Sequence, residues 1–571
     1  MLKFDIDFCT NTAMRRRVPI SYDGFQRQSS KKIDGYLLDF VVLLLLGINF
    51  NVLGQLKFLP LDQFYRDRTF GVTLEGYSNQ NFKNQPYRFG AFYPAFEHHS
   101  YELSTLNASK NRGTWLGRKL FDEHFFEFKN DEVFINFDIL ADLSVGRDSR
   151  DPTNKQYYYN TRGIQVNGGI GKYFGFFSTL RENQARFLDY QVKELRKGGT
   201  ISTTQNGNLT QGGAFVSGAG RTKPFQDNAF DFAFVTGALF VKPSKNLIVT
   251  FGNNPLFVGA GHRSLFYSDH SNMFPHIRFS WEISKYINAQ VVYAQHNNLI
   301  KMALNTPGTE RLFEKKGYTL KYINLIPFKS LQISFFEGSS WLRYDNNNID
   351  RVHPLYYNPL PFLNPAILGQ KGGNANILLG IQALWNVWQS IHLYTQFAFD
   401  NIGVSDPSVQ VGMRFSEPLK IKNLHLQLEA NRIPAAAYQH ENRRLNYINN
   451  NVSLAHPLGA GVEEILGRIN YEWKRIGFLA QANIIRTVQN TLNAVNGIPL
   501  APLPISLDAS FDPVIIGFSQ FDLFYRFNKR SNLQIFTSII YRRESLANQT
   551  NNTLYFGFGM RTALSNRYFD L

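Results

Sequence analysis

The sequence has almost no cysteine, few charged residues and, beyond residue 54, no long apolar run. Cys9 is the single cysteine among 571 residues, and it lies in a segment that we expect to be removed. The mature chain would then have no disulfide and no cysteine-ligated metal site. No continuous apolar stretch of 18 residues follows residue 54, which excludes membrane-spanning helices there.

The N-terminal residues resemble a secretion leader. Lys31 and Lys32 precede an apolar run over residues 41–53, and Gly54 ends a small-residue cleavage site. This pattern predicts a signal peptide that is processed near Gly54. A membrane anchor is the alternative, but the run is shorter than the ~20 apolar residues that span a bilayer. Residues 1–30 are too polar for an ordinary leader, so we expect an over-extended start.

Aromatic residues and positive charge are abundant. The chain is 15% aromatic, with 51 Phe and 28 Tyr, only 18% of its residues are charged, and its formal net charge is +16. A basic surface suits acidic partners such as nucleic acid, lipopolysaccharide phosphate or an anionic polysaccharide. Charge alone does not choose among them.

From residue 133 onward, apolar and polar residues alternate with a period of two, which predicts strands with one apolar face. Val133, Ile135 and Phe137, for example, alternate with Asn136 and Asp138. The predicted strands cover residues 133–143, 157–167, 170–181, 228–242, 246–253, 276–285, 287–296, 317–326, 330–338, 376–388, 390–400, 408–415, 422–432, 464–473, 476–486, 519–528, 531–543 and 552–562. We therefore predict eighteen strands.

The connections between these strands alternate between short turns and, in most cases, long loops. Turns such as Lys474-Arg475 contrast with loops such as 182–227 and 433–463. An even strand number with this alternation is typical of a bacterial outer-membrane barrel, whose closure pairs every backbone group in lipid. We predict an all-β, antiparallel transmembrane barrel.

Three segments follow from these patterns. Residues 1–54 are an N-terminal extension and signal peptide, residues 55–131 are a partly helical segment with a short helix over Thr114–His124, and residues 132–571 are the barrel.

The loop 254–275 carries the densest set of functional residue types. It contains His262, Arg263, Ser264, Asp269 and His270. These supply the parts of a Ser-His-Asp nucleophile, but no G-x-S-x-G motif accompanies them. Two other interpretations are a loop folded onto the barrel wall by Arg263 and Asp269, and a glycan-contact surface. We expect no catalytic residue.

Further candidates for glycan contact lie in other loops. Arginine and lysine side chains bind carboxylate and phosphate groups, and aromatic faces stack on sugar rings. The full set of candidate ligand residues is Lys193, Arg196, Lys197, Arg221, Lys223, His262, Arg263, Asp269, Trp341, Tyr344 and His456. The aromatic members have an alternative interpretation as an interfacial belt. His98 and His99 are adjacent and lack a carboxylate at ligand spacing, so we expect no metal site and no cofactor.

Four stretches resemble one family. Residues 251–281 read FGNNPLFVGAGHRSLFYSDHSNMFPHIRFSW and are similar to a motif of the Wzi-like capsule assembly and RemB-type gliding-associated outer-membrane proteins of Bacteroidetes. Residues 161–183, 374–380 and 454–464 (LAHPLGAGVEE) resemble that group in the same order. The sequence departs from the family pattern at His262 and at residues 460–462. The resemblance implies an eighteen-stranded barrel with an N-terminal helical portion that holds capsular polysaccharide.

Together these observations predict a non-enzymatic barrel of the outer membrane with its long loops outside the cell. We expect it to bind or anchor exopolysaccharide or capsular polysaccharide, or to support adhesion and gliding motility. The expected partners are membrane lipid, lipopolysaccharide, an acidic surface polysaccharide, and gliding or secretion machinery, but not nucleic acid. A diffusion porin is the alternative, and a hydrolase at the barrel rim is a third interpretation.

Overall fold

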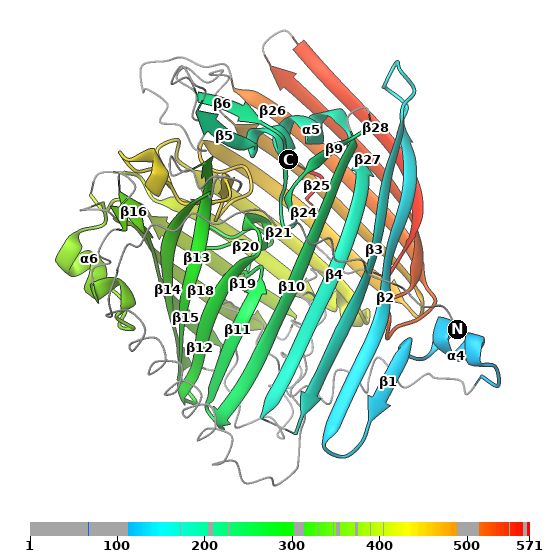
Figure 1. The fold of residues 1–571 in the computed structure, drawn as a ribbon, viewed down its shortest axis with the longest axis horizontal. Coiled ribbons are helices and arrows are strands. Elements are labelled where there is room, and N and C mark those ends of the chain that lie inside the picture. The colour runs from blue at the N-terminus through cyan, green and yellow to red at the C-terminus, as the bar shows by residue number, and fades with distance from the viewer. Residues whose placement is uncertain are drawn as a thin grey trace, which may run out of the picture. The chain divides into compact units, whose positions relative to one another are not determined.

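Eighteen antiparallel strands follow one another along the chain and close into a barrel in the computed structural model (Figure 1). The structure describes Asp67 and residues 112–171, 173–203, 209–226, 229–301, 313–328, 330–345, 348–349, 354–371, 375–388, 390–403, 405–487, 513–546, 549–562 and 568–570. All of these belong to one compact unit, residues 52–571. The predicted signal peptide and His98 and His99 lie outside the described residues.

The strands of the barrel occur in chain order. They are β2 (Val133–Asp148), β3 (Gln156–Ile170), β4 (Phe174–Arg186), β10 (Ala229–Ser244), β11 (Leu247–Asn254), β12 (Phe274–Ser284), β13 (Ile287–Lys301), β14 (Phe313–Phe328), β15 (Leu331–Leu342), β18 (Ala375–Trp388), β19 (Ile391–Phe399), β20 (Ser408–Ser416), β21 (Leu424–Ile433), β24 (Val462–Trp473), β25 (Ile476–Thr487), β26 (Val514–Arg526), β27 (Gln534–Leu546) and β28 (Gln549–Arg561). Each of the eighteen predicted strands is present, so the fold prediction is confirmed.

The last strand closes the barrel on the first. β28 pairs antiparallel with β2 from Asp142↔Arg561 to Asp148↔Tyr555. The backbone groups of these seven residues on each strand are therefore paired with each other, and β1 pairs with Phe134–Phe137 of β2 below the seam.

Short and long connections lie at opposite ends of the barrel. Turns of two residues, 245–246, 285–286 and 474–475, join strands at one end, which we call the turn end. At the other end, the loop end, the connections 187–228, 343–374 and 434–461 are much longer and contain most of the remaining structure.

The smaller elements lie in these connections and before β2. The helices are α4 (Trp115–Phe121), α5 (Asp189–Lys197), α6 (Leu363–Leu368), η2 (Asp269–Ser271), η3 (Pro354–Tyr357), η4 (Pro418–Lys420) and η5 (Arg443–Leu445). The short strands are β1 (Phe126–Lys129), β5 (Thr200–Thr203), β6 (Leu209–Gly212), β7 (Phe215–Val216), β8 (Gly220–Arg221), β9 (Lys223–Phe225), β16 (Tyr344–Asp345), β17 (Asn348–Ile349), β22 (Ile448–Asn449) and β23 (Val452–Ser453). Among the described residues, no helix has the length and apolar character that crossing a membrane requires.

The helix expected over Thr114–His124 is α4. Thr114 caps it, because its hydroxyl accepts a bond from the N–H of Gly117 at 3.2 Å. The amide of Asn528, in the turn between β26 and β27, donates to the carbonyls of Lys119 and Glu123, each at 2.8 Å. α4 therefore lies against the turn end. The sequence did not predict β1, which follows it and pairs with β2.

The wall has an apolar outer face and a polar inner face. On β2, Ile139 and Leu143 are exposed on the outside, whereas Asp138 and Asp142 are buried on the inside. Large aromatic side chains are exposed near the turn end: Trp281, Tyr286, Trp385, Trp388, Trp473 and Tyr525. An apolar band with an aromatic rim is the surface that a barrel presents to lipid and to the membrane–water boundary.

The seam between β28 and β2 generates a stability prediction. A Cβ atom at Gly559 would lie 2.4 Å from the carbonyl oxygen of Leu143, so a larger residue must push the two strands apart. We expect Gly559→Val to destabilise the folded barrel by about 1–3 kcal/mol, the usual cost of overpacking. The measurement is the folded fraction, from heat-modifiable gel migration across a urea series.

The matched control is Gly517→Val. Gly517 lies on β26, and nothing lies within 4 Å of a Cβ atom placed there. It should fold as the unmodified chain does. Equal loss of folding in the two variants would contradict this account of the seam.

Candidate functional site

The connection between β11 and β12, residues 255–273, folds back into the lumen, where we call it the plug loop. Its backbone is held by wall side chains: the N–H of Ala260 donates to Gln382 (3.1 Å), those of His262 and Arg263 to Glu429 (2.6 and 3.1 Å), and that of Leu265 to Gln396 (2.9 Å). A buried N–H group without a partner costs about 1–3 kcal/mol. The side chains of Gln382, Gln396 and Glu429 therefore stabilise the loop by accepting bonds that a neighbouring strand would otherwise accept.

Arg263 fixes the plug loop to the wall. Its guanidinium is fully buried and donates twice to the Glu464 carboxylate of β24, at 3.1 and 2.8 Å, and once to Asp570 at 2.5 Å. Burial opposes the charge of Arg263, but Asp570 and Glu464 outweigh it and raise the pKa of the guanidinium above its usual value. The sequence interpretation named Arg263 and Asp269 as the residues that hold this loop to the wall. Arg263 makes such a contact, whereas Asp269 accepts from Tyr568, near the end of the chain.

A second long connection, residues 434–461, packs against the plug loop. The ring of His456 bonds to Glu464 at 3.0 Å, and the N–H of Ser268 donates to the carbonyl of Leu454 at 2.7 Å. The hydroxyls of Tyr438 and Tyr447 donate to plug-loop carbonyls at 3.1 and 2.9 Å. Residues 454–459 (LAHPLG) therefore contact the plug loop and the wall inside the barrel.

Residues 568–570 also lie in the lumen. Asp570 accepts from Arg263 and from Gln481, the latter at 2.6 Å. The hydroxyl of Tyr568 donates to Asp269 at 2.5 Å. The sequence patterns did not identify Asp570, Tyr568 and Glu429, because no local pattern marks a residue whose partner is 166 to 307 positions away.

Ser264 and His270 are two further polar residues of the plug loop, and both are buried. The Ser264 hydroxyl donates to the carbonyl of Val258 and accepts from the N–H groups of Phe266 and Tyr267 at 3.0 and 3.1 Å. Burial, assisted by the charges of Arg263 and His456, lowers the pKa of His270 to about 3, so its ring is neutral at neutral pH.

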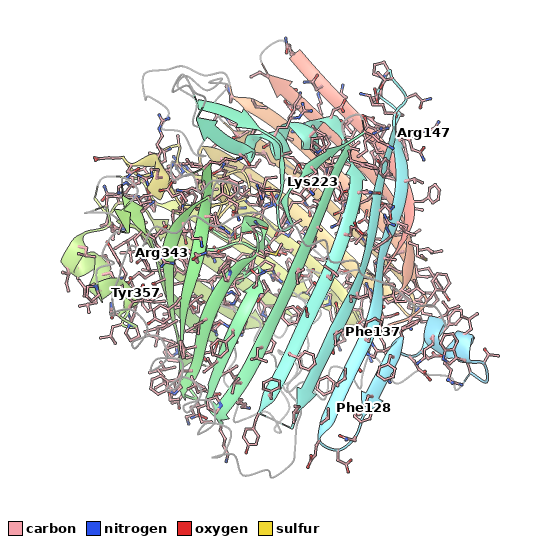
Figure 2. The ribbon with its side chains drawn as sticks, in the orientation of Figure 1. Phe128, Phe137, Arg147, Lys223, Arg343 and Tyr357 are labelled. Atoms are coloured by element: carbon pink, nitrogen blue, oxygen red, sulfur yellow. The ribbon has the colours of Figure 1, made fainter. Side chains whose placement is uncertain are left out.

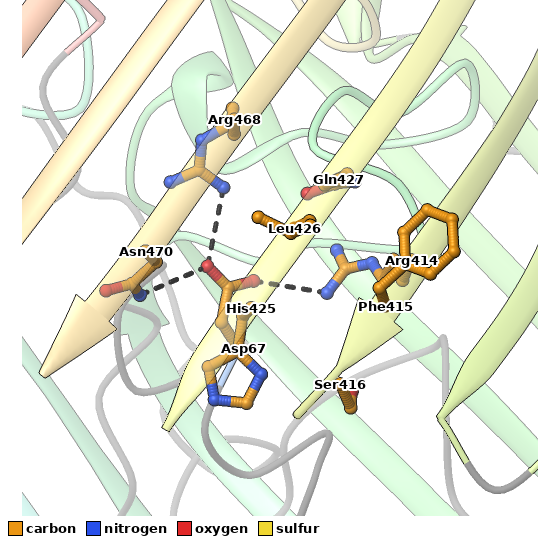
Figure 3. A pocket seen from close by; sticks show the side chains of 9 residues that line it. All are labelled: Asp67, Arg414, Phe415, Ser416, His425, Leu426, Gln427, Arg468 and Asn470. Atoms are coloured by element: carbon orange, nitrogen blue, oxygen red, sulfur yellow. Dashed lines mark hydrogen bonds and ion pairs between the residues drawn. The ribbon is translucent and has the colours of Figure 1, made fainter. Parts of the chain in front are cut away.

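A further charged cluster lies inside the wall toward the turn end (Figure 3). The carboxylate of Asp67 lies 3.2 Å from Arg414, 3.5 Å from Arg468 and 3.4 Å from the amide of Asn470. These three residues come from β20 and β24. Asp67, a residue of the predicted N-terminal segment, is therefore bound inside the lumen.

The five predicted cations of the 182–227 loop are all exposed. Lys193, Arg196 and Lys197 are on α5, at positions three and four residues apart, and so share one face of the helix. Arg221 and Lys223 follow on β8 and β9, and Lys223 lies toward the loop end (Figure 2).

The opposite face of α5 carries Val192 and Leu195, which pack in an apolar cluster with Phe230 and Phe232. Lys197 also pairs with Glu194 at 2.5 Å, and the guanidinium of Arg221 lies 4.7 Å from the ring centroid of Phe313. The packed face fixes the helix and leaves its cations at the surface.

Burial divides the candidate ligand residues into two groups. His262, Arg263, Asp269 and His456 are buried inside the barrel, whereas the five cations are exposed. Trp341 is on the outer face of the wall but is buried because Tyr356 covers it, with 4.7 Å between the two ring centroids. The side chain of Tyr344 lies outside the described residues. Among the described residues, no group of three or more His, Cys, Asp or Glu side chains is arranged to hold a metal ion.

Comparison with known proteins gives structural similarity at low identity. No protein-family model matches the sequence, and no curated protein matches it significantly. One similar structure is Wzi of Escherichia coli, an outer membrane protein involved in group 1 capsule assembly and a carbohydrate-binding β-barrel. Wzi is 12% identical to this chain, and the match has a TM-score of 0.46 and covers 74% of this chain and 83% of Wzi. OccAB2 of Acinetobacter baumannii is 9% identical with a TM-score of 0.38, over 75% and 97% of the chains. OprD of Pseudomonas aeruginosa is 8% identical with a TM-score of 0.37, over 75% and 94%.

The Arg263 cluster generates a prediction about the plug loop. Arg263→Ala leaves the carboxylates of Glu464 and Asp570 buried without their cation, which typically costs about 3–5 kcal/mol. We expect a lower urea midpoint of unfolding and new protease cleavage within residues 255–273.

Arg486→Ala is the control. Arg486 pairs with Glu463 at 3.1 Å, but both side chains are largely exposed, so its loss should cost less than about 1 kcal/mol. Indistinguishable midpoints for the two variants would mean that Arg263 does not hold the plug loop.

Proposed function

We propose that the protein is a non-enzymatic outer-membrane barrel that holds an acidic surface polysaccharide on the exposed cations of its loop end. The observation that carries this proposal is that the lumen contains its own chain. Plug-loop residues Val258, Leu265 and Phe266 form one buried core with inward residues of the wall and with Tyr438 and Leu454 of the second connection.

An outer-membrane location is supported by the surface of the wall. The exposed outer residues form an apolar band with aromatic side chains near the turn end. In this proposal the short turns lie in the periplasm, and the long connections, with the cations, lie outside the cell.

The cations suit a polyanion because all five side chains are exposed at the loop end. Arg196 and Lys193 project from the exposed face of α5, and Arg221 and Lys223 continue the positive surface along the same connection. Guanidinium groups bind carboxylate or phosphate with two parallel hydrogen bonds, so uronic-acid or phosphate-bearing glycans fit this surface. Lipopolysaccharide phosphate offers the same chemistry.

A diffusion porin is the alternative function. The polar inner wall and the Arg414–Asp67–Arg468 cluster would suit the passage of small charged solutes. Passage would have to bypass the plug loop and the Arg263–Glu464–Asp570 cluster, which lie across the interior. We therefore favour surface binding over permeation.

The sequence resemblance adds a physiological setting to the proposal. A barrel that holds surface glycan would serve capsule assembly, and in a gliding bacterium the same surface would serve adhesion. We place no catalytic step at Ser264, since its hydroxyl donates to the Val258 carbonyl and is fully buried.

The test neutralises the proposed surface. Replacing Lys193, Arg196, Lys197, Arg221 and Lys223 with Gln removes five exposed cations. At about 0.5 kcal/mol each, their loss should weaken binding of an acidic polysaccharide roughly 50-fold or more at low salt. Rising salt should erase the difference, because the Debye length is only about 8 Å at physiological ionic strength. Binding is measured on intact cells and on purified barrel.

The control variant has the same net charge. Arg147, Arg150, Arg432, Arg486 and Arg543 are exposed arginines outside the proposed surface, and they are replaced with Gln together. Normal folding and near-normal binding are expected. If both variants lose binding equally, the attraction is one of net charge, and no specific surface exists at α5.

A further inference from the structure

A charged pair lies on the outer wall, where lipid contact is expected. Lys321 of β14 and Glu337 of β15 face each other across the two strands, with 2.9 Å between Nζ and Oε1. The alternating neighbours Leu320 and Phe336 belong to the lumen core, so Lys321 and Glu337 point outward. Both are nevertheless almost completely buried.

The pair lies at the height of the apolar band. Across the sheet, Lys321 pairs with Val291, and Val291 pairs in turn with Phe279. Phe279 is exposed on the outer face. Lys321 is seven residues from Phe328 at the turn end, or about 18 Å along the axis of a barrel whose strands tilt by ~40°. The apolar band of such barrels is about 25 Å tall.

Residues 354–368, which include η3 and α6, cover this pair from outside, and we call them the flap. The N–H of Phe362 donates to Glu337 at 2.5 Å, the Thr319 hydroxyl donates to the carbonyl of Tyr356 at 2.8 Å, and the Tyr293 hydroxyl donates to that of Tyr357 at 2.7 Å. Tyr356 also packs with Trp341 and Ile377 on the outer wall. Figures 1 and 2 show α6 and Tyr357 at the outer side of the sheet, beside β14 and β15.

The flap has the composition of a segment that contacts hydrocarbon. Residues 354–368 read PLYYNPLPFLNPAIL and contain no Asp, Glu, Lys or Arg, whereas 18% of the whole chain is charged. Four of the fifteen residues are prolines, which have no N–H group to leave unpaired. Leu360 donates its N–H to the side chain of Asn358 at 2.7 Å, and Ala366 donates to the carbonyl of Phe362 at 3.2 Å.

The outer side of the flap is apolar and exposed. Leu360 is 62% exposed and Ile367 is 58% exposed, and Tyr357 and Phe362 are exposed beside them. This surface continues the apolar wall that carries Phe279 and Ile277. An uncharged, apolar surface continuous with the lipid face fits the same partner as that face.

We propose that the flap is immersed in the membrane: it shields the Lys321–Glu337 pair on the outer wall and presents Leu360, Phe362 and Ile367 to the acyl chains of the bilayer. The proposal rests on the proposed outer-membrane location but not on glycan binding. A charge facing hydrocarbon costs several kcal/mol, so the cover allows a polar patch to persist at this depth.

The first test locates the flap by fluorescence quenching. Single cysteines at Leu360 and Ile367, in a chain with Cys9→Ser, carry an environment-sensitive dye in liposomes. Phe279→Cys on the wall is the lipid control and Lys193→Cys on α5 is the water control. We expect brominated acyl chains to quench the dye at Leu360 and Ile367 as strongly as at Phe279, and aqueous iodide to quench only at Lys193.

Each other outcome contradicts the proposal in a distinguishable way. Iodide quenching at Leu360 and Ile367, with Phe279 still quenched by lipid, would place the flap in water and leave the barrel's location intact. Disulfide-linked dimers through Leu360→Cys without lipid quenching would make this face an interface between two copies. Failure of lipid quenching at Phe279 would overturn the membrane location itself.

The second test asks whether the flap acts through the charged pair. Replacing residues 355–368 with a Gly/Ser linker of equal length should lower the fraction of heat-modifiable barrel formed in liposomes several-fold. Adding Lys321→Met and Glu337→Met to that variant should restore it, because the uncovered wall is then apolar. A linker variant that folds in liposomes as the unmodified chain does, or one that the two substitutions do not rescue, would refute the shielding role.

Discussion

Every backbone N–H and C=O group in the wall must be paired, and the rest of the structure depends on this constraint. The β2–β28 seam meets it by closing the sheet, since the last strand pairs with the first. Closure also sorts the side chains, since alternate residues must face either hydrocarbon or the interior. Asp138, Asp142 and Glu464 are therefore turned inward, where each buried polar group needs a partner.

The chain supplies those partners itself. Glu429 accepts from two plug-loop N–H groups, and Arg263 is held between Glu464 and Asp570. Buried pairs of this kind give little net stability but strongly disfavour any arrangement that breaks them. These contacts consequently favour one arrangement of the interior, and we propose the cations of the loop end and the outer wall as the surfaces that meet partners. The flap gives buried polar groups a partner on the outside of the wall in the same way. It covers Lys321 and Glu337, which face away from the lumen, and donates a hydrogen bond to Glu337.

Local patterns predicted the wall well and its contents poorly. Period-two alternation and the rhythm of short and long connections are local properties, and they identified all eighteen strands. Strand ends were less accurate: β26 begins at Val514 rather than at residue 519. Arg263 was recognised as a residue that ties its loop down, but its partner Asp570 is 307 positions away. The outward direction of Lys321 and Glu337 could have been read from the alternation of β14 and β15, yet their cover is a loop contact that no periodicity encodes.

The barrel's interior is occupied by its own chain, and we infer that its surfaces rather than a pore carry its function. Single-channel conductance of the purified protein in a planar bilayer tests this most directly. The account predicts very small conductance for the unmodified protein and a large, stable increase when residues 256–272 of the plug loop are replaced by a short linker. A wide conductance in the unmodified protein, unchanged by that replacement, would contradict the account and favour a diffusion porin.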